Sequence, residues 1–301
     1  MAGLLKNIPA DSIHIKTPAQ QYFRPSALRE ALSLKQERPD ALVVCGATDI
    51  ALRVTKQHEL LVEIIDLSGI EELKGLEETA SSLSIGAGVS LNRAMPVLRK
   101  DFPALYEMLS VFGSQQIRNL ATFGGNLGTA SPIGDTIPVL MAYNAKVVLQ
   151  NTRARREVAL DDFITGYRTT VRKPDELITA VVMPKMLSGA LVRSYKVSKR
   201  KDLDISTVSA GFKVDFENGM SVKDVKLAYG GMAERVKRAT DAENLLIGKK
   251  WDRETVVKAM EMIEKEFTPI SDARGSAEFR RIAAKNLLMK FWGETRNGGN
   301  E

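Results

Sequence analysis

Residues 118–138 read Arg-Asn-Leu-Ala-Thr-Phe-Gly-Gly-Asn-Leu-Gly-Thr-Ala-Ser-Pro-Ile-Gly-Asp-Thr-Ile-Pro. This stretch holds more small and polar residues than one face of a helix or a strand needs. Its glycines, Gly124, Gly125 and Gly128, let a ligand come close to the backbone. Hydrogen-bonding side chains are supplied by Thr122, Asn126, Thr129, Ser131 and Asp135. The composition predicts a loop wrapped around a polar, phosphate-bearing ligand.

A second glycine turn lies upstream, at Val43-Val44-Cys45-Gly46-Ala47-Thr48-Asp49. It reads as the end of an apolar strand, a turn and the start of a helix. Backbone N–H groups at such a turn favour phosphate oxygens. Alone, a glycine before a helix is more often only a turn. Together, the two turns are suited to hold the two ends of a dinucleotide.

The composition narrows the class of protein. The 301 residues are 44% hydrophobic and 27% charged, which allows two domains. No apolar run reaches the roughly 18–20 residues that span a bilayer, and the first residues lack the apolar core of a secretory signal. A single cysteine, Cys45, excludes an intrachain disulfide and an iron–sulfur or thiolate zinc site made by this chain alone. We expect a cytoplasmic, metal-free chain with no membrane partner.

The charge distribution argues against nucleic-acid binding. Lys and Arg number 43 against 37 Asp and Glu, a net charge of +6. The clusters Lys199-Arg200-Lys201 and Lys249-Lys250 are short and lack interleaved aromatic residues. This pattern favours solvated faces or a partner surface over a nucleic-acid site. A mild basic surplus also suits an anionic cofactor.

The pattern of elements predicts an α+β chain of two blocks that meet near residue 188. Residues 1–20 read as a loose lead-in or linker. The first block alternates strands and helices, with strands expected at 41–45, 60–67, 83–87, 145–149 and 177–183. The second block begins with three strands, the last two joined by the hairpin turn Asn218-Gly219. Three helices then follow, at 241–247, 253–267 and 276–291.

The two glycine turns resemble the FAD-binding domain of molybdenum hydroxylases, a family that includes xanthine dehydrogenase and the medium subunit of carbon monoxide dehydrogenase. The likeness is greatest to the small FAD subunit of bacterial xanthine dehydrogenases, without its iron–sulfur domain. Further motifs support it in the family's order: Phe23–Ser26 with Glu30–Leu32, Tyr229–Ala233, and Asp272–Arg280. The resemblance covers nearly the whole chain.

The resemblance implies a two-subdomain FAD-binding fold of the molybdopterin dehydrogenase or vanillyl-alcohol-oxidase-like type. It would occupy residues 21–187, with subdomains of about 21–75 and 76–187 and FAD in the cleft between them. A C-terminal α+β domain of the carbon monoxide dehydrogenase flavoprotein type, with a β-meander and helices, would follow at 188–295.

The resemblance also implies roles for single residues. The first turn (Val43, Val44, Cys45, Gly46, Ala47, Thr48 and Asp49) would hold the FAD pyrophosphate and reach the flavin. The diphosphate and ribityl chain would be bound by Thr122, Gly125, Asn126 and Thr129. Phe112 would stack on the flavin, unless it is a core residue. Asp135 would hydrogen-bond the flavin side, unless it caps a helix. The adenine would lie against Ile178 or Thr179 and Lys196, although a lysine on a strand is ordinarily exposed.

The implied reaction is electron transfer. A molybdenum cofactor on another chain would oxidise the substrate, and iron–sulfur clusters would pass electrons to FAD and then to NAD or O2. The partners would be a molybdopterin-binding large subunit and an iron–sulfur domain or subunit, in a hetero-oligomer. No catalytic side chain is expected here, because the cofactor carries the chemistry. Two alternatives are a non-catalytic assembly module that holds no flavin alone, and a standalone flavin oxidase.

Overall fold

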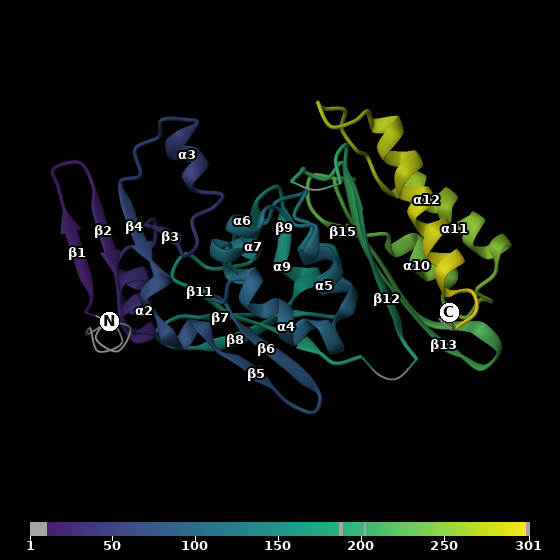
Figure 1. Ribbon diagram of the computed structural model, residues 1–301, viewed down its shortest axis with the longest axis horizontal. Helices are drawn as coiled ribbons and strands as arrows, with labels where there is room; N and C mark the ends of the chain where they lie inside the picture. Colours follow the sequence, from purple (N-terminus) through teal and green to yellow (C-terminus); the bar gives the residue numbers. More distant parts are fainter. Residues whose placement is uncertain (1–10, 187–188, 202, 299–301) are drawn as a thin grey trace.

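The computed structural model describes residues 11–186, 189–201 and 203–298. Three layered units follow one another along the long axis, from β1 at one end to the helices α10–α12 at the other (Figure 1). Each unit is a sheet covered by helices, which confirms the expected α+β class. In the described ranges, no helix combines the length and the hydropathy that crossing a bilayer requires.

The first unit is a four-stranded sheet. Its spatial order is β1 (Ile13–Lys16), β2 (Gln21–Arg24), β4 (Glu63–Asp66) and β3 (Leu42–Val44). The accompanying helices are α2 (Leu28–Glu37), α3 (Ala51–Thr55), η1 (Leu67–Gly69) and η2 (Glu71–Lys74). Helix α2 buries Ala31 and Leu32 against Phe23 and Ile65 of the sheet. Strand β3 pairs with β4 in parallel, and the first glycine turn follows directly after β3.

The second unit is a five-stranded antiparallel sheet with helices packed on it. Its order is β5 (Leu76–Glu78), β6 (Ser82–Gly86), β11 (Leu177–Pro184), β7 (Lys146–Gln150) and β8 (Arg155–Ala159). A small hairpin pairs β9 (Ile164–Gly166) with β10 (Thr169–Thr170). The helices are α4 (Leu91–Asp101), α5 (Pro103–Ser110), α6 (Gln115–Leu120), α7 (Phe123–Thr129), α8 (Thr136–Ala142) and α9 (Leu160–Phe163).

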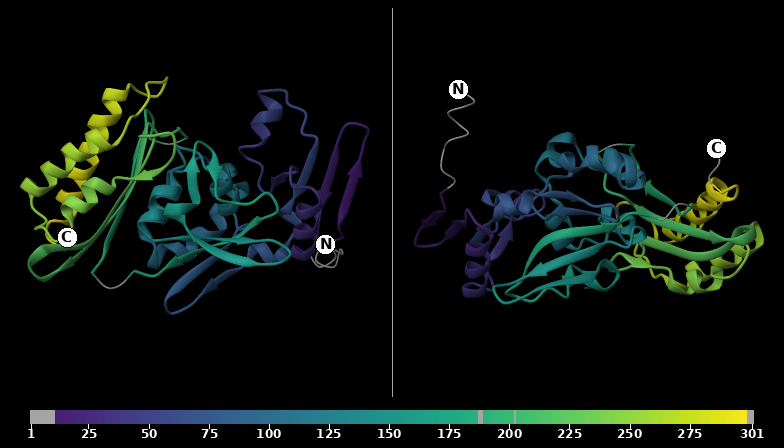
Figure 2. Two further views of the ribbon diagram at one scale, coloured as in Figure 1. Left: turned by 180° about the vertical axis from the view of Figure 1, so that it is seen from behind. Right: turned by 90° about the horizontal axis from the view of Figure 1, so that it is seen from below.

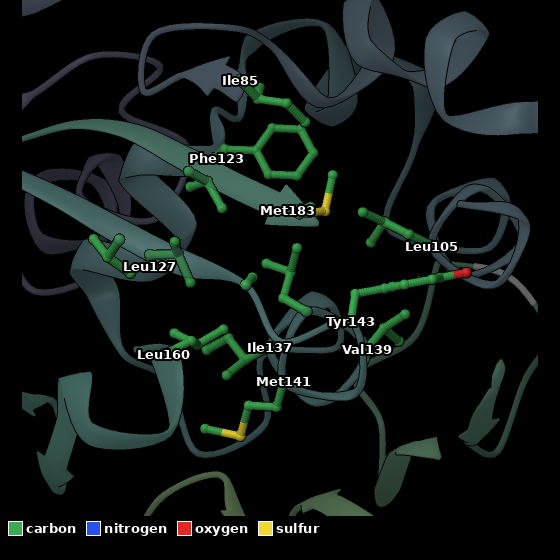
Figure 3. Packing of buried hydrophobic residues seen from close by; sticks show 14 of the residues in the cluster. Ile85, Leu105, Phe123, Leu127, Ile137, Val139, Met141, Tyr143, Leu160 and Met183 are labelled. Carbon is green, nitrogen blue, oxygen red and sulfur yellow. The ribbon is translucent and has the colours of Figure 1, made fainter. Parts of the chain in front are cut away.

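The main hydrophobic core lies between this sheet and its helices. Figure 3 shows Phe123 and Leu127 of α7 grouped with Ile85 and Met183 of the sheet. Every residue of α8 is buried, so this short helix forms the centre of the molecule. Burying such apolar area stabilises the fold by about 25 cal/mol per Å². The core therefore fixes α7, and with it the glycines on its outer face.

The third unit is a meander with three helices. Its strands lie in chain order, β12 (Leu191–Val197), β13 (Val208–Glu217), β14 (Ser221–Gly230) and β15 (Lys237–Arg238), with the turn η3 (Asn218–Met220) between β13 and β14. The helices are α10 (Thr240–Leu246), α11 (Arg253–Glu266) and α12 (Ala277–Thr295). They cover one face of the sheet (Figure 2), while α8 packs on the other. A Cβ on Gly211 would lie 2.3 Å from Pro138, so β13 touches α8 backbone to backbone.

The structure differs from the sequence expectations in two places, and a third expectation falls outside the described residues. Residues 13–16 of the expected lead-in form β1, which pairs with β2, whereas residues 1–10 lie outside the described ranges. The meeting point of the two blocks, at 187–188, also lies outside them. The expected loop at 118–138 holds the end of α6, all of α7 and the start of α8. Glycine-rich α7 has low helix propensity, but Phe123 and Leu127 anchor it in the core.

Candidate functional site

The first turn presents unpaired backbone donors. It runs from the end of β3 to the start of α3, and Ala47 adopts a left-handed backbone with φ of 55°. That conformation is uncommon for a residue other than glycine and is concentrated at functional sites. Among the hydrogen bonds of the described residues, none is donated by the backbone N–H groups of residues 46–49. Successive free N–H groups of this kind form an anion-binding concavity.

The first turn lies directly against the second glycine stretch. A Cβ on Gly46 would lie 1.7 Å from the carbonyl oxygen of Leu120, so the two backbones touch. Cys45, the residue before Gly46, directs its thiol toward Gly88, where a Cβ would lie 3.6 Å from Sγ. Burial is the main reason that the pKa of this thiol is raised to about 11, which makes it a neutral packing group at neutral pH. Segments far apart in sequence thus form one surface.

Helix α7 offers a bare glycine face beside this contact. Thr122 caps the helix by accepting a hydrogen bond from the N–H of Gly125 at 3.0 Å. Gly125 and Gly128 are exposed one helical turn apart, and Thr129 is half-buried beside them. No side chain there keeps a ligand from the backbone. The amide oxygen of Asn126 instead accepts from the Thr136 hydroxyl, so this side chain is directed toward α8.

A buried ion pair joins the second and third units. Lys196 Nζ lies 2.5 Å from Asp135 Oδ2, and both side chains are less than a tenth exposed. Asp135 Oδ1 accepts a hydrogen bond of 2.6 Å from the Ser206 hydroxyl. Asp135 precedes α8 but makes no capping hydrogen bond, so the helix-cap interpretation is wrong. Lys196 is likewise buried, and is not the exposed lysine that is ordinarily found on a strand.

This contact also corrects the assignment of the two residues to opposite ends of FAD. The resemblance placed Asp135 beside the flavin and Lys196 beside the adenine. A pair separated by 2.5 Å cannot lie at the two ends of one extended dinucleotide. Residues that pair across 61 positions of sequence give no local signal of their contact. At most one of the two proposed roles can hold.

The remaining predicted residues lie around this surface. Phe112 is half-buried two residues after α5 and packs against the main core, and Arg118 Nη1 donates to its carbonyl oxygen at 2.8 Å. Ile178 is buried on β11 beneath Gly128 of α7. Thr179, named with Ile178 for the adenine contact, has a buried side chain. The stacking role of Phe112 and the adenine contact of Ile178 stay predictions.

Two features have no counterpart in the sequence expectations. Arg168, in the hairpin between β9 and β10, donates to Asp49 of the first turn at 3.2 Å. An open pocket of about 430 Å³ also begins at Lys196 and is lined by Val111 and residues 196–201. A Tyr-Arg pair between a glycine and a threonine resembles an ordinary turn, so only the fold reveals the contact of Arg168.

Comparison with known families identifies the chain. Residues 17–186 match the family described as the FAD binding domain in molybdopterin dehydrogenase, and residues 193–295 match the CO dehydrogenase flavoprotein C-terminal domain. The chain belongs to this FAD-binding family. The cofactor in the description of this family is FAD, as the resemblance implied.

Relatives with known names agree with the family. Xanthine dehydrogenase/oxidase of Gallus gallus is 33% identical over 302 residues, which cover 95% of this chain and 22% of that protein. Xanthine dehydrogenase of Emericella nidulans is 31% identical, with 91% of this chain and 21% of that protein covered. The chain therefore spans about a fifth of the length of these curated relatives.

The matching chains of solved structures, in contrast, are covered over nearly their whole length. Quinoline 2-oxidoreductase from Pseudomonas putida 86 matches with a TM-score of 0.84 and 25% identity, over 95% of this chain and 99% of that one. Carbon monoxide dehydrogenase from Hydrogenophaga pseudoflava gives a TM-score of 0.85 and 25% identity, over 92% and 96%. The whole described fold, including the third unit, is thus shared with molybdenum hydroxylase chains.

The chemistry of the site suits FAD. A diphosphate needs several N–H donors, and residues 46–49 offer free ones. A dinucleotide laid across a helix needs an approach free of side chains, which Gly125 and Gly128 provide. The donor set and the bare face lie on segments that touch at Gly46 and Leu120.

Proposed function

We propose that the chain is the FAD-binding, electron-transfer part of a molybdenum hydroxylase of the xanthine dehydrogenase type. Electrons would arrive from iron–sulfur clusters and leave through FAD to NAD or O2. The observation that carries the proposal is the backbone contact between Gly46 and Leu120, which joins two glycine segments into one anion-binding surface. The named relatives, both xanthine dehydrogenases, support the reaction class.

In this proposal the chain binds and positions the cofactor. The free N–H groups of residues 46–49 hold the diphosphate. The glycine face of α7 lets the cofactor lie close to Thr122 and Thr129, and Ile178 supports that helix from below. When bound, FAD supplies the redox chemistry, accepting electrons and passing them to the final acceptor. The buried ion pair of Asp135 and Lys196 lies beside the pocket that begins at Lys196.

The proposal includes partners. A molybdopterin-binding subunit would oxidise the substrate, and an iron–sulfur domain or subunit would deliver the electrons, in a cytoplasmic hetero-oligomer. Carbon monoxide dehydrogenase and quinoline 2-oxidoreductase chains of matching length support such a modular arrangement. The short basic cluster at 199–201, beside the pocket, offers a surface for an acidic partner or an anionic acceptor.

The test separates cofactor binding from electron transfer. The purified chain is titrated with FAD, reduced without oxygen, and mixed with NAD⁺ or with O2 while absorbance near 450 nm is followed. We expect one FAD per chain and reoxidation by at least one acceptor. Failure of both acceptors to reoxidise bound flavin would contradict the electron-transfer proposal while leaving FAD binding intact.

The two alternative functions give other outcomes in the same preparation. An assembly module would take up no FAD but would co-purify with a molybdenum-containing subunit. A standalone flavin oxidase would keep its flavin after acid precipitation, through a covalent bond to His14, His58 or Cys45. The thiol of Cys45 is poorly suited to that bond, because burial raises its pKa to about 11.

A further inference from the structure

Arg280 is a charged residue buried in the outer helix layer of the third unit. It lies on the first turns of α12 and is only 1% exposed. Its Nη1 donates to the carbonyl oxygens of Thr207 and of Gly231, the latter at 3.0 Å. Its Nη2 donates to Asp272 Oδ1 at 2.7 Å. A buried guanidinium is retained at high desolvation cost, so its contacts call for an explanation.

The carboxylate of Asp272 balances the positive charge of this guanidinium. Burial raises the pKa of Asp272, but hydrogen bonds from Arg274 and Arg280 outweigh that effect and hold it at about 2. The carboxylate therefore stays ionised, and Arg280 remains paired throughout the neutral range. Two of its N–H groups are left to act on backbone carbonyls.

The first of these carbonyls belongs to the segment that holds the buried ion pair. Thr207 follows Ser206, whose hydroxyl donates to Asp135. The N–H of Thr207 also donates to the carbonyl oxygen of Val197 at 2.8 Å, directly after Lys196. The residue bound by Arg280 is thus adjacent in sequence to one partner of Asp135 and bonded to the neighbour of the other.

The second carbonyl belongs to the other strand that reaches the ligand segment. The N–H of Gly231 donates to the carbonyl oxygen of Pro132 at 2.8 Å, in the turn that leads to Asp135. Gly231 has φ of 80°, and a Cβ there would lie 2.3 Å from the Thr207 carbonyl oxygen. The two strand ends therefore lie against each other at the point where Arg280 binds both.

We propose that Arg280 is a positioning residue for the FAD site, acting through Thr207 and Gly231 on the Pro132–Asp135 turn and on the Asp135–Lys196 pair. This inference rests on the proposed function for its effect on FAD. Its guanidinium fixes both strand ends with one planar group, which a lysine ammonium cannot reproduce. Without it, Ser206 and Gly231 lose their fixed placement, and Lys196 becomes accessible.

The test compares Arg280→Lys and Arg280→Met with Arg281→Met in the full chain. Arg281 is the next residue of α12, and its side chain makes none of the contacts that Arg280 makes. The first measurement, on FAD-free protein, is the rate at which an N-hydroxysuccinimide ester acetylates Lys196, followed by mass spectrometry. The others are the FAD dissociation constant and the visible circular dichroism of bound flavin. Urea unfolding checks that each variant is folded.

We expect both Arg280 variants to acetylate Lys196 about tenfold faster, to bind FAD about tenfold more weakly, and to change the flavin dichroism. Arg281→Met should match the unaltered chain. Folded Arg280 variants that differ only in their urea midpoint would overturn the proposal, because a purely structural residue predicts that result. Arg280→Lys keeps the charge and serves if the methionine variant does not fold.

The acetylation rate separates this proposal from the proposed function. If the unaltered chain binds no FAD but the Arg280 variants expose Lys196, the positioning role holds and the FAD proposal fails. If FAD binds and Lys196 stays protected in every folded variant, the positioning role fails and the FAD proposal stands.

Discussion

Gly46 and Leu120 lie so close that a Cβ on the glycine would be 1.7 Å from the leucine carbonyl oxygen. Real Cβ atoms never approach a backbone oxygen so closely, so the position requires glycine or a shift of the whole turn. The residues on either side of Gly46 are also held in place in this turn. Cys45 has a thiol whose pKa burial raises to about 11, and Ala47 holds the left-handed conformation of the turn. One contact therefore fixes the donors of residues 46–49 against α6 and α7.

Gly46→Ala should damage FAD binding and stability together. Forcing the turn away from Leu120 costs about 1–3 kcal/mol of unfolding free energy, and displaced donors should weaken FAD binding about tenfold or more. Gly75→Ala is the matched control, because its Cβ would meet only the Glu77 side chain at 3.8 Å. Urea unfolding and FAD titration measure the two effects. Equal behaviour of both variants would refute the role of the contact.

Gly125→Leu should remove FAD binding while leaving the fold intact. The glycine is exposed on α7, and a Cβ would meet only the Thr122 hydroxyl, at 3.1 Å. Leucine is also a better helix former than glycine, by about 0.5–1 kcal/mol. We expect FAD affinity to fall about 100-fold, with no loss in urea unfolding. Gly293→Leu, at an exposed glycine of α12 with nothing within 4 Å, should keep full affinity.

Residues 118–138 show which features of the fold the sequence predicts and which it does not. The glycine spacing pointed to a segment whose Gly125 and Gly128 are exposed, but not to a helix at Phe123–Thr129, and its role as a ligand surface stays a prediction. Local propensity disfavours that helix, and it depends on tertiary contacts such as Gly124 against Ala87, where a Cβ would lie 2.6 Å away. In the second unit the three inner strands β6, β11 and β7 were predicted from their apolar runs, whereas the polar edge strands β5 and β8 were missed.

Long-range polar contacts were the part that sequence could not supply. Asp135 was recognised as a special carboxylate, but its partners Lys196 and Ser206 come from another unit of the fold. Arg168 was missed because its contact with Asp49 spans 119 residues. No periodicity or local motif encodes such pairs. They form only in the folded chain, where β12 carries Lys196 to the turn before α8 and the β9–β10 hairpin carries Arg168 to the first turn.

Lys196→Met should destabilise the protein far more than loss of a surface ion pair does. It leaves the buried Asp135 carboxylate with Ser206 as its one partner among the described residues, and breaking a buried pair from one side costs about 3–5 kcal/mol. Lys258→Met removes a pair in which the side chains of Lys258 and Glu254 are 61% and 80% exposed, and should change stability little. Urea unfolding at pH 7 compares the two. Similar losses would contradict the buried character of the Lys196 pair.

Lys35 should make stability depend on pH above neutrality. Burial, together with the charge of Arg172, lowers the pKa of Lys35 to about 8 from an ordinary value of 10.5. Between these values the unfolded chain holds more protons than the folded one, so the unfolding free energy rises with pH. The full gain is about 1–3 kcal/mol. Below pH 8 the lysine is charged in both states and adds no slope.

The measurement for Lys35 is the difference between the unaltered chain and Lys35→Met, followed by urea unfolding from pH 7 to 10. The variant also leaves the carbonyl oxygens of Pro39 and Ala41 without the ammonium donor, which shifts its stability by a constant amount at every pH. Only the slope is therefore diagnostic. Parallel pH profiles would show that the pKa of Lys35 is not lowered in the folded chain.

The reactivity of the Cys45 thiol should report whether the first turn stays packed against Leu120. It is the only cysteine, and burial is the main cause that raises its pKa to about 11 from 9.0. Because the thiolate is the reacting species, iodoacetamide at pH 8 should alkylate the folded chain roughly 100-fold more slowly than the urea-unfolded chain. Gly46→Ala, which forces the turn away from Leu120, should recover much of that rate without urea, whereas Gly75→Ala should not. Equal rates in the folded and unfolded chains would mean that the Cys45 thiol is not buried, which would contradict the packing of the first turn against the second segment.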